Sequence, residues 1–516
     1  MLSRPGTRAR RIAMLTRSSF ETSGRRPAQE PCALSDVTGT YSSDLRLATK
    51  LSIGIGLIYL AFLAPGIYNI DEHSMLAVAE SLVTHNGVAV PAGLGSAGRN
   101  GLTFSIWYPL LSFLDVPFAW LALVSSRAAH LPFRNLAAVF SLVLPCALTS
   151  ATAGIVFLLS RRIGSSLRGA CLASLSFAFG TVALVYARTF FAEPLLAFLT
   201  AAALHLCFGD RYWGAAAMAG LAVLAKPTGI VVGLVLAVYL MAKRKPQAAL
   251  LQGLGSALGL GLYLVYNYYR YADPFEFGPP HWFRLSNIPP GVAALLASPI
   301  WGLIWYCPVV VLAVCVFRGA KHSGLFEILA ISGILGSYLL LYSSWRNASG
   351  TAWDGGWSWG PRYLLPALPG ICALLGTLGK RMERVIVPFI LLGFLINAPT
   401  LVSYYERFFA ESLEQGTPLG QDTGWSLQNA PLFHAWPAAI REARDAKHSD
   451  VGRVLQERGD SSDLISNSPA LRTVAVWWWV LPILHMPRWI GCIVALALVV
   501  SGCVILIASF QFCCRL

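Results

Sequence analysis

The stretch LSIGIGLIYLAFLAPGIYNIDEHS, residues 51–74, places a long apolar run directly before two carboxylates and an imidazole. Asp71, Glu72 and His73 follow the apolar residues after only a short turn. Ionisable groups are costly inside a bilayer, and those beside a spanning segment commonly mark a functional site. The stretch therefore predicts a membrane-spanning helix that ends at a polar site.

The whole chain has the composition of a membrane protein. Of its 516 residues, 56% are hydrophobic and 12% are charged, whereas about 25% of residues are charged in an average soluble protein. Apolar runs of roughly 17–25 residues, long enough to span ~30 Å of hydrocarbon, recur along the sequence. This pattern predicts an all-α polytopic membrane protein, because a transmembrane β-barrel would show short alternating segments.

The net charge of +14 does not indicate a nucleic-acid partner. Lys and Arg lie between the apolar runs, where they set the orientation of spans by the positive-inside rule. The eleven Cys residues show neither metal-ligand spacing nor a disulfide framework. Most of them lie in apolar runs, where cysteine behaves as a small buried hydrophobic residue.

The positive-inside rule predicts about twelve spans with both termini in the cytoplasm. Residues 107–126 are apolar enough to span, but then the basic residues after position 160 would lie outside. We therefore expect residues 68–133 to form one long external loop that carries an interfacial helix. Residues 213–242 should be two short spans broken at Pro227, since proline ends or kinks a helix. One continuous span is expected over 298–317.

Four regions follow from this topology. Residues 1–46, rich in Arg, Ser and Gly, predict a disordered basic cytoplasmic tail. Residues 47–404 form the transmembrane module, and residues 405–475 form a charged soluble segment on the external side. Residues 476–516 hold an interfacial segment, whose Trp run favours the membrane interface, and the last span.

Unusual polar residues gather on the external face of this topology: Asp71, Glu72, Arg188, Glu193, Lys226 and Arg362. A carboxylate there can accept a proton from an attacking hydroxyl, and Arg or Lys can hold a departing phosphate. ATP and nucleotide sugars are absent outside the cell, which favours a lipid-linked donor. The pattern thus indicates group transfer from a polyprenyl-phosphate carrier.

Each of these residues also has a purely structural explanation. The two acids at 71 and 72 could simply begin a solvated loop. Arg188 and Lys226 could be flanking charges that snorkel to the interface, and Glu193 could be an acid favoured by the start of a helix. Trp357 and Trp359 could belong to an interfacial belt.

Several motifs resemble the GT-C superfamily of integral membrane glycosyltransferases, which includes protein O-mannosyltransferases and the bacterial aminoarabinose transferase of lipid A. They span roughly residues 48–405 and are similar to the superfamily in order and topology. The segments are YNIDE at 68–72, FFAEPL at 190–195, GLAVLAKPTG at 220–229, YN at 266–267 with DPFEFG at 273–278, SPIWGLIWY at 298–306 and WDGGWSWGPRY at 353–363.

The resemblance implies a GT-C-like bundle, a polyprenyl-phosphate-sugar donor and an inverting transfer with Asp71 as base and Glu72 in support. It assigns the donor phosphate to Arg188, Lys226 and Arg362. The lysine that the lipid A transferase carries in its first loop is absent here, where the sequence reads FSIWYP at 104–109, so its role would fall to Arg99 or another cation. Substrate contacts are expected from Glu193, Tyr108, Asn267, Trp357, Trp359 and Tyr363.

The remaining expectations concern partners and place. The acceptor would be an envelope lipid, glycan or protein, reached from the bacterial inner membrane with the active site on the external face; membrane lipids are further partners. No cofactor is required by the sequence, although Asp71 and Glu72 are compatible with a divalent cation. The alternative function is a twelve-span secondary transporter or flippase of a lipid-linked or envelope substrate, a class that places its charges near the midplane.

Overall fold

The computed structural model describes residues 34–67, 69–85, 87–277, 283–319, 324–345, 353, 355–409, 423–427, 430–445, 475–479, 481 and 486–515. The chain divides into two units, Met1–Ser43 and Asp44–Leu516. Except for the first residues of α1, all the features below belong to the second unit.

The first third of the chain is helical, with one small antiparallel strand pair in which Ser96 lies opposite Phe104. Pro109 occupies the first turn of α3, where its missing N–H costs no hydrogen bond. The elements are α1 (Leu34–Ala61), α2 (Ile70–Val83), β1 (Ser96–Ala97), η1 (Arg99–Gly101), β2 (Thr103–Phe104), α3 (Pro109–Ala129), α4 (Phe133–Ser141) and α5 (Val143–Arg162).

The middle of the chain is a series of apolar helices joined by short turns. Lys226 ends one of these helices in an extended conformation, as expected for a residue that precedes proline. The elements are α6 (Leu167–Gly180), α7 (Ala183–Tyr186), α8 (Glu193–Phe208), α9 (Tyr212–Ala225), η2 (Pro227–Gly229), α10 (Ile230–Ala242) and α11 (Pro246–Tyr271).

The last part alternates short and long helices. The elements are η3 (Leu285–Asn287), α12 (Ile288–Ala297), α13 (Leu303–Tyr306), η4 (Pro308–Ala313), α14 (Val314–Gly319), α15 (Leu325–Ser343), η5 (Arg362–Ala367), α16 (Leu368–Leu375), α17 (Lys380–Asn397), η6 (Ala398–Leu401), η7 (Thr423–Trp425), α19 (Pro431–Asp445), η9 (Trp477–Trp479) and α21 (Arg488–Arg515).

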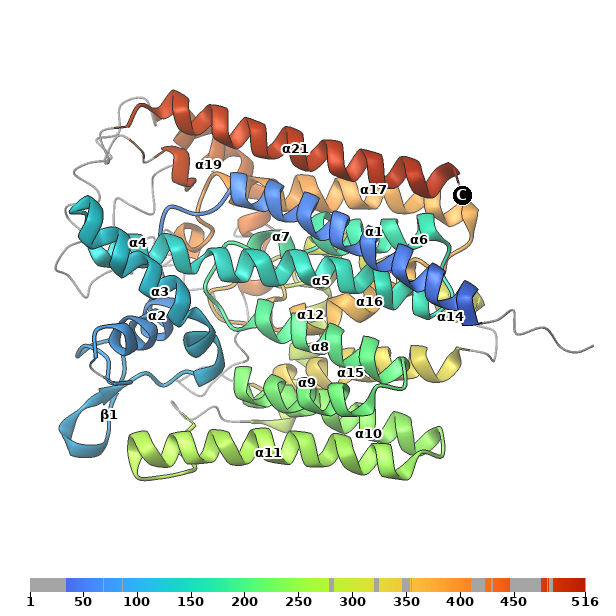
Figure 1. Ribbon diagram of the computed structural model, residues 1–516, viewed down its shortest axis with the longest axis horizontal. Helices are drawn as coiled ribbons and strands as arrows, with labels where there is room; N and C mark the ends of the chain where they lie inside the picture. Colours follow the sequence, from blue (N-terminus) through green and yellow to red (C-terminus); the bar gives the residue numbers. More distant parts are fainter. Residues whose placement is uncertain are drawn as a thin grey trace, which may run out of the picture. The chain divides into compact units, whose positions relative to one another are not determined.

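The long helices run roughly side by side, and the elements between α1 and α4 lie at one end of them. Figure 1 shows α2, α3 and β1 beyond the end of the array at which α8 begins. α3 packs chiefly against α2 and α4. This arrangement agrees with the predicted first loop that carries a helix at the end of the bundle.

The opposite end of the helices holds ion pairs between neighbouring segments. Arg161 pairs with Asp44, Arg168 with Glu383, Lys243 with Glu327 and Lys245 with Asp210. These four basic residues therefore gather at the end away from Asp71, as the positive-inside rule predicts for a cytoplasmic end.

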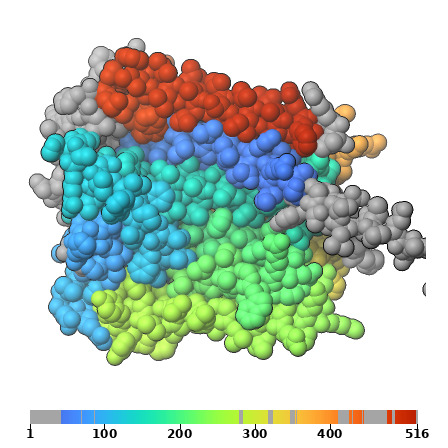
Figure 2. Space-filling view, in the orientation of Figure 1, coloured from blue at the N-terminus to red at the C-terminus, as the bar shows by residue number. Residues whose placement is uncertain are grey.

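Close helix contacts in the array depend on glycine. A Cβ on Gly259 of α11 would lie 2.2 Å from the Gly220 carbonyl oxygen of α9, so the two backbones touch. α21 and α1 meet in the same way, since a Cβ on Gly502 would lie 2.6 Å from the Gly54 carbonyl oxygen. Figure 2 shows α21 in red along the edge of the face beside α1. Small residues bring backbones this close in many membrane helix pairs.

The prediction of an all-α polytopic membrane protein is confirmed, and the span count of twelve stays a prediction. By length and composition, six helices within the described ranges can cross a membrane: Pro109–Ala129, Phe133–Arg162, Pro246–Tyr271, Leu325–Ser343, Lys380–Leu401 and Arg488–Cys513. Six shorter apolar helices accompany them. The region over 107–126 forms one of the six, so length and composition allow it to span, whereas its packing favours the end of the bundle.

Two expectations about helix bounds were wrong. The segment 298–317 is not one helix but α13, η4 and α14 in succession, because Pro299, Gly302 and Pro308 interrupt it. The tail predicted over 1–46 ends sooner, since α1 already begins at Leu34. The rest of that tail lies outside the described residues, as does most of the predicted soluble segment 405–475.

Candidate functional site

Asp71 lies in the first turn of α2, directly after the helix cap. The Asn69 side chain caps this helix by accepting a hydrogen bond from the Asp71 backbone N–H at 2.7 Å. An Asn cap of this kind satisfies an N–H group that has no partner within the helix. The Asp71 carboxylate is half-buried, so it is both held by the helix and open to a reactant.

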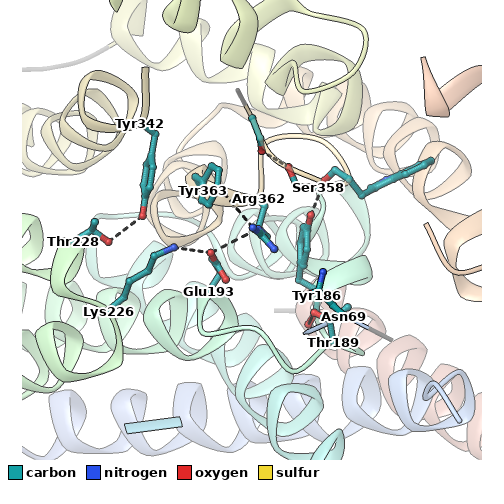
Figure 3. Close-up of polar contacts among 12 residues, drawn as sticks. Asn69, Tyr186, Thr189, Glu193, Lys226, Thr228, Tyr342, Ser358, Arg362 and Tyr363 are labelled. Atoms are coloured by element: carbon teal, nitrogen blue, oxygen red, sulfur yellow. Dashed lines mark hydrogen bonds and ion pairs between the residues drawn. The ribbon is translucent and has the colours of Figure 1, made fainter. Parts of the chain in front are cut away.

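Glu193, Lys226 and Arg362 form a buried cluster of charges. Lys226 Nζ lies 2.8 Å from Glu193 Oε1, and Arg362 Nε lies 3.8 Å from the same oxygen. Figure 3 shows the lysine and the arginine reaching Glu193 from opposite sides. Glu193 is only 3% exposed, Lys226 4% and Arg362 7%. Removing one partner from a buried group of this kind would leave uncompensated charge.

Local sequence explains how these charges come together. Glu193 is the first residue of α8, where the positive end of the helix dipole favours an acid. Arg362 begins η5 after Gly360, whose φ of +61° and closeness to the Tyr306 ring admit only glycine. Because α8 packs against both α9 and η5, the helix ends meet at Glu193.

Aromatic rings surround the two cations. Lys226 Nζ lies 4.9 Å from the Tyr363 ring centroid and 5.4 Å from that of Tyr342, whose rings stack on each other. The Arg362 guanidinium lies 4.2 Å from the Phe191 ring centroid. Ring faces attract cations at these distances.

Electrostatics link Asp71 to this cluster. Burial raises the pKa of Asp71 to about 6, Arg362 and Lys226 oppose the rise, and Glu193 adds to it. Burial also raises the pKa of the Tyr108 phenol, and Lys226 opposes that rise. Asp71 and Tyr108 therefore both lie within electrostatic range of the cations. A pKa near 6 leaves Asp71 mostly ionised at neutral pH and basic enough to accept a proton.

Glu72 lies beside Asp71 in sequence but is fully buried. Burial raises its pKa well above the ordinary value and the neighbouring Glu406 adds to the rise, while the Phe190 backbone N–H opposes it. The buried Oε1 of Glu72 has no hydrogen-bond partner within the described residues. Burial beside Glu406 therefore disfavours the charged form of Glu72, which makes it a poorer candidate base than Asp71.

Two of the predicted phosphate ligands lie elsewhere. Arg188 is buried and donates to the Thr400 and Ala475 carbonyl oxygens, so it ties distant segments together. Arg99 lies over the Tyr268 ring of α11 at 4.9 Å. The structure brings Lys226 and Arg362 together and leaves these two apart from them.

Among the predicted substrate contacts, Glu193, Tyr108 and Tyr363 lie at the cluster. Asn267 and Trp359 do not, because their polar groups are used inside the protein. Asn267 bonds to the Pro274 and Glu276 carbonyl oxygens and to Arg270, and Trp359 donates to Asn397. Trp357 is half-buried and stacks on Phe409.

The described ranges contain no group of three or more His, Cys, Asp or Glu residues placed to hold a metal ion. The carboxylates of this region face different partners instead: Lys226 for Glu193 and Asn69 for Glu406. A divalent cation at Asp71 and Glu72 stays a prediction.

Sequence reasoning missed Glu406, which is only 3% exposed and receives a hydrogen bond from Asn69. The same signal that pointed to Asp71, an acid just after an apolar run, was present at the sequence YYER over 404–407. The boundary expected at residue 404 separates Glu406 from the transmembrane module.

Fold and site together define a class: a polytopic helical membrane protein with a buried mixed-charge cluster and an adjacent carboxylate at one end of its helices. Two matching solved structures are both of ArnT from Cupriavidus metallidurans. The apo form shares 15% identity at a TM-score of 0.46, over 90% of this chain and 78% of that one. The form bound to undecaprenyl phosphate shares 14% at 0.46, over 85% of each.

No protein-family model matches the chain, and neither does a curated protein.

Proposed function

We propose that this protein is a GT-C-type membrane glycosyltransferase that moves a sugar from a polyprenyl-phosphate donor to an external acceptor hydroxyl. One observation carries the proposal: a half-buried carboxylate, Asp71, faces two buried cations, Lys226 and Arg362. A base opposite a pair of phosphate-binding cations matches the needs of this transfer.

The proposed reaction is a single displacement. Asp71 takes the proton of the acceptor hydroxyl, and the hydroxyl oxygen forms a bond to the anomeric carbon of the sugar. The bond between that carbon and the phosphate oxygen breaks, and its electron pair leaves with the polyprenyl phosphate. Attack from the side opposite the leaving group inverts the anomeric centre.

Lys226 and Arg362 would stabilise the negative charge that grows on the departing phosphate. In the structure, both cations share one oxygen of Glu193. Glu193 therefore holds them side by side before the donor arrives, and the phosphate would share them with it. Donors placed in advance cost no reorganisation at the moment of reaction.

The lipid carrier follows from position and chemistry. The cluster lies at the end of the helices away from the ion pairs of Arg161, Arg168, Lys243 and Lys245, and the positive-inside rule supports an external side for it. A donor on that side of a bacterial inner membrane must bring its activated sugar without a nucleotide. The acceptor would be an envelope lipid, glycan or protein.

The test in cells is mass spectrometry of envelope glycans from strains with the gene deleted, restored, or restored as Asp71→Asn. One sugar modification should vanish on deletion, return with the wild-type gene and stay absent with Asp71→Asn at equal protein level. An unchanged glycan profile on deletion would contradict the proposal. Accumulation of a substrate in proteoliposomes without sugar transfer would favour the transporter instead.

A further inference from the structure

Glu406 is a buried acid that has no role in the proposed reaction. It lies nine residues after Asn397 in sequence and is only 3% exposed. Carboxylates are seldom fully buried unless they are paired. The charge of Arg362 acts on Glu406, but within the described part of the chain the ion pair of Arg362 is with Glu193.

The segment that carries Glu406 is fixed by three contacts. Asn397 accepts a hydrogen bond from Trp359 at 2.8 Å, Arg188 donates to the Thr400 carbonyl oxygen at 2.9 Å, and the Ala475 backbone N–H donates to the Val402 carbonyl oxygen at 2.6 Å. Glu406 is therefore placed by groups outside α2, which lets it serve as a reference point for that helix.

The Asn69 side chain connects Glu406 with Asp71. Its Nδ2 donates to Glu406 Oε1, and its Oδ1 accepts from the Asp71 backbone N–H. An amide has a donor end and an acceptor end. The hydrogen bond to Glu406 therefore decides that the oxygen of Asn69, and not its nitrogen, points at the first turn of α2.

We propose that Glu406 is a positioning residue, which orients the Asn69 amide as the cap of α2 and so holds the Asp71 carboxylate against the acceptor. This inference rests on the proposed function, since it concerns the same base. Misplacing a reacting group by about 1 Å can cost roughly 100-fold in rate, so the cap is worth more to catalysis than to stability.

The charges around Glu406 fit this role. Burial raises its pKa to about 8, while its bond from Asn69 and the charge of Arg362 oppose the rise. At neutral pH the side chain is mostly protonated, and its carbonyl oxygen still accepts from Asn69. The groups that face it are Asn69, Arg362, Asp71, Glu72 and Tyr405. Acceptance of a hydrogen bond, and not charge, is what the role requires.

The experiment compares variants of the purified protein in proteoliposomes, with a polyprenyl-phosphate sugar as donor. Glu406→Gln keeps an acceptor oxygen, whereas Glu406→Met has similar volume and no acceptor. Asn69→Ala removes the cap itself. Ser166→Ala is the matched control, because Ser166 caps α6 by accepting from the Gly169 N–H at 2.9 Å, away from Asp71.

Glu406→Met and Asn69→Ala should each lower kcat at least 10-fold with the donor KM within two-fold of wild type. Glu406→Gln should retain at least a third of kcat, and Ser166→Ala should retain all of it. Equal losses in Glu406→Gln and Glu406→Met would overturn the proposal, as would a full kcat in Glu406→Met or a loss confined to KM.

A second readout needs no enzymatic activity. Carbodiimide reacts with protonated carboxyl groups, so the yield of labelled Asp71 peptide, followed by mass spectrometry, reports its titration. The midpoint should fall from about 6 toward the ordinary carboxyl range in Asn69→Ala and Glu406→Met, because a loosened first turn admits water. It should stay in place in Glu406→Gln and Ser166→Ala.

The two readouts distinguish the proposed function from the positioning role of Glu406. A wild-type protein without transfer activity, but with the expected pattern of labelling, would contradict the proposed function and keep the positioning role. Transfer activity with the same Asp71 midpoint in all the variants would keep the function and overturn the role of Glu406.

Discussion

At the scale of single residues, the two neighbouring acids of the site differ in their burial and in their charged neighbours. Asp71 is half-buried and faces Arg362 and Lys226, which limit the rise of its pKa to about 6. Glu72 is fully buried beside Glu406, so its pKa is raised well above the ordinary value. Paired acids whose environments separate their pKa values often divide their tasks. Asp71, with a pKa of about 6, is therefore the better candidate base of the two.

The pKa of Asp71 predicts the acidic side of the pH–rate profile. Asp71 must be ionised to accept a proton, and its folded-state pKa is raised, so kcat/KM should increase with pH through about 6. Arg362 opposes the rise, so Arg362→Gln should move this limb to higher pH. A profile that is flat through this range would contradict the assignment of the base.

The buried ion pair predicts a separation between stability and activity. Lys226→Met leaves Glu193 buried without its 2.8 Å partner, and such a loss costs about 3–5 kcal/mol. Glu193 keeps only its weaker partner Arg362 at 3.8 Å, so adding Glu193→Gln and Arg362→Met removes both remaining buried charges, and the thermal midpoint of the triple variant in detergent should recover. Its affinity for polyprenyl phosphate should stay low, since both cations are missing. Equal recovery of both quantities would remove Lys226 from the donor site.

A substitution of Arg188 tests whether this residue has a purely structural role. Its guanidinium donates to the Thr400 and Ala475 carbonyl oxygens, and hydrogen bonds from charged groups contribute about 1.5–3 kcal/mol each. Arg188→Met should therefore lower the thermal midpoint and leave the polyprenyl-phosphate affinity of the folded protein unchanged. A loss of affinity at an unchanged midpoint would return Arg188 to the phosphate site, where sequence reasoning put it.

At the scale of elements, glycine contacts hold the helices that present Lys226. A Cβ on Gly259 of α11 would meet the Gly220 carbonyl oxygen of α9 at 2.2 Å, whereas a Cβ on Gly261 would meet nothing within 4 Å. Gly259→Ala should thus push α9 and α11 apart, lower the thermal midpoint and reduce transfer, because Lys226 follows α9 directly.

Gly261→Ala is the matched control in the same helix. It should keep both the midpoint and the activity, and helix propensity gives alanine a small advantage over glycine. If both variants behave alike, the close approach of α9 and α11 does not support the site.

The sequence predicts a helix break well only where the residue that causes the break acts on its immediate neighbours. The break at Lys226 and Pro227 was predicted, because proline acts on its immediate neighbours. The breaks in 298–317 were not predicted, although prolines mark them, because hydropathy alone favours one continuous span there. Hydropathy reports burial in lipid and says little about where a helix bends.

The site shows the same limit. Asp71, Lys226 and Arg362 were found because each is an unusual charge beside an apolar run. Their separation from Arg99 and Arg188 depends on which helix ends meet, and that is a property of packing. Glu406 and its bond with Asn69 join positions 337 residues apart, a pairing that no local pattern encodes.

At the scale of the whole molecule, the two ends of the helices carry different sets of charged residues. The ion pairs of Arg161, Arg168, Lys243 and Lys245 lie at one end, and Asp71 with its cluster lies at the other. A transporter would be expected to place such charges near the midplane. A site at the end of the helices suits an enzyme that meets a lipid headgroup and an acceptor from outside.

This division predicts the orientation of the protein in the membrane. In a background without the eleven native cysteines, a cysteine at exposed Asp273 should react with an impermeant maleimide added to intact cells. A cysteine at exposed Arg244 should react only after the cells are opened. The reverse pattern would put the cluster on the cytoplasmic side and contradict the external site.

The central claim is that Asp71 starts transfer from a polyprenyl-phosphate sugar. Its most direct test is release of polyprenyl phosphate by the purified protein in proteoliposomes, with wild type, Asp71→Asn and the exposed control Asp273→Asn. The account predicts release that depends on acceptor in wild type and control, with at least a 100-fold loss in Asp71→Asn and unchanged donor binding. Release by Asp71→Asn at the wild-type rate would contradict it.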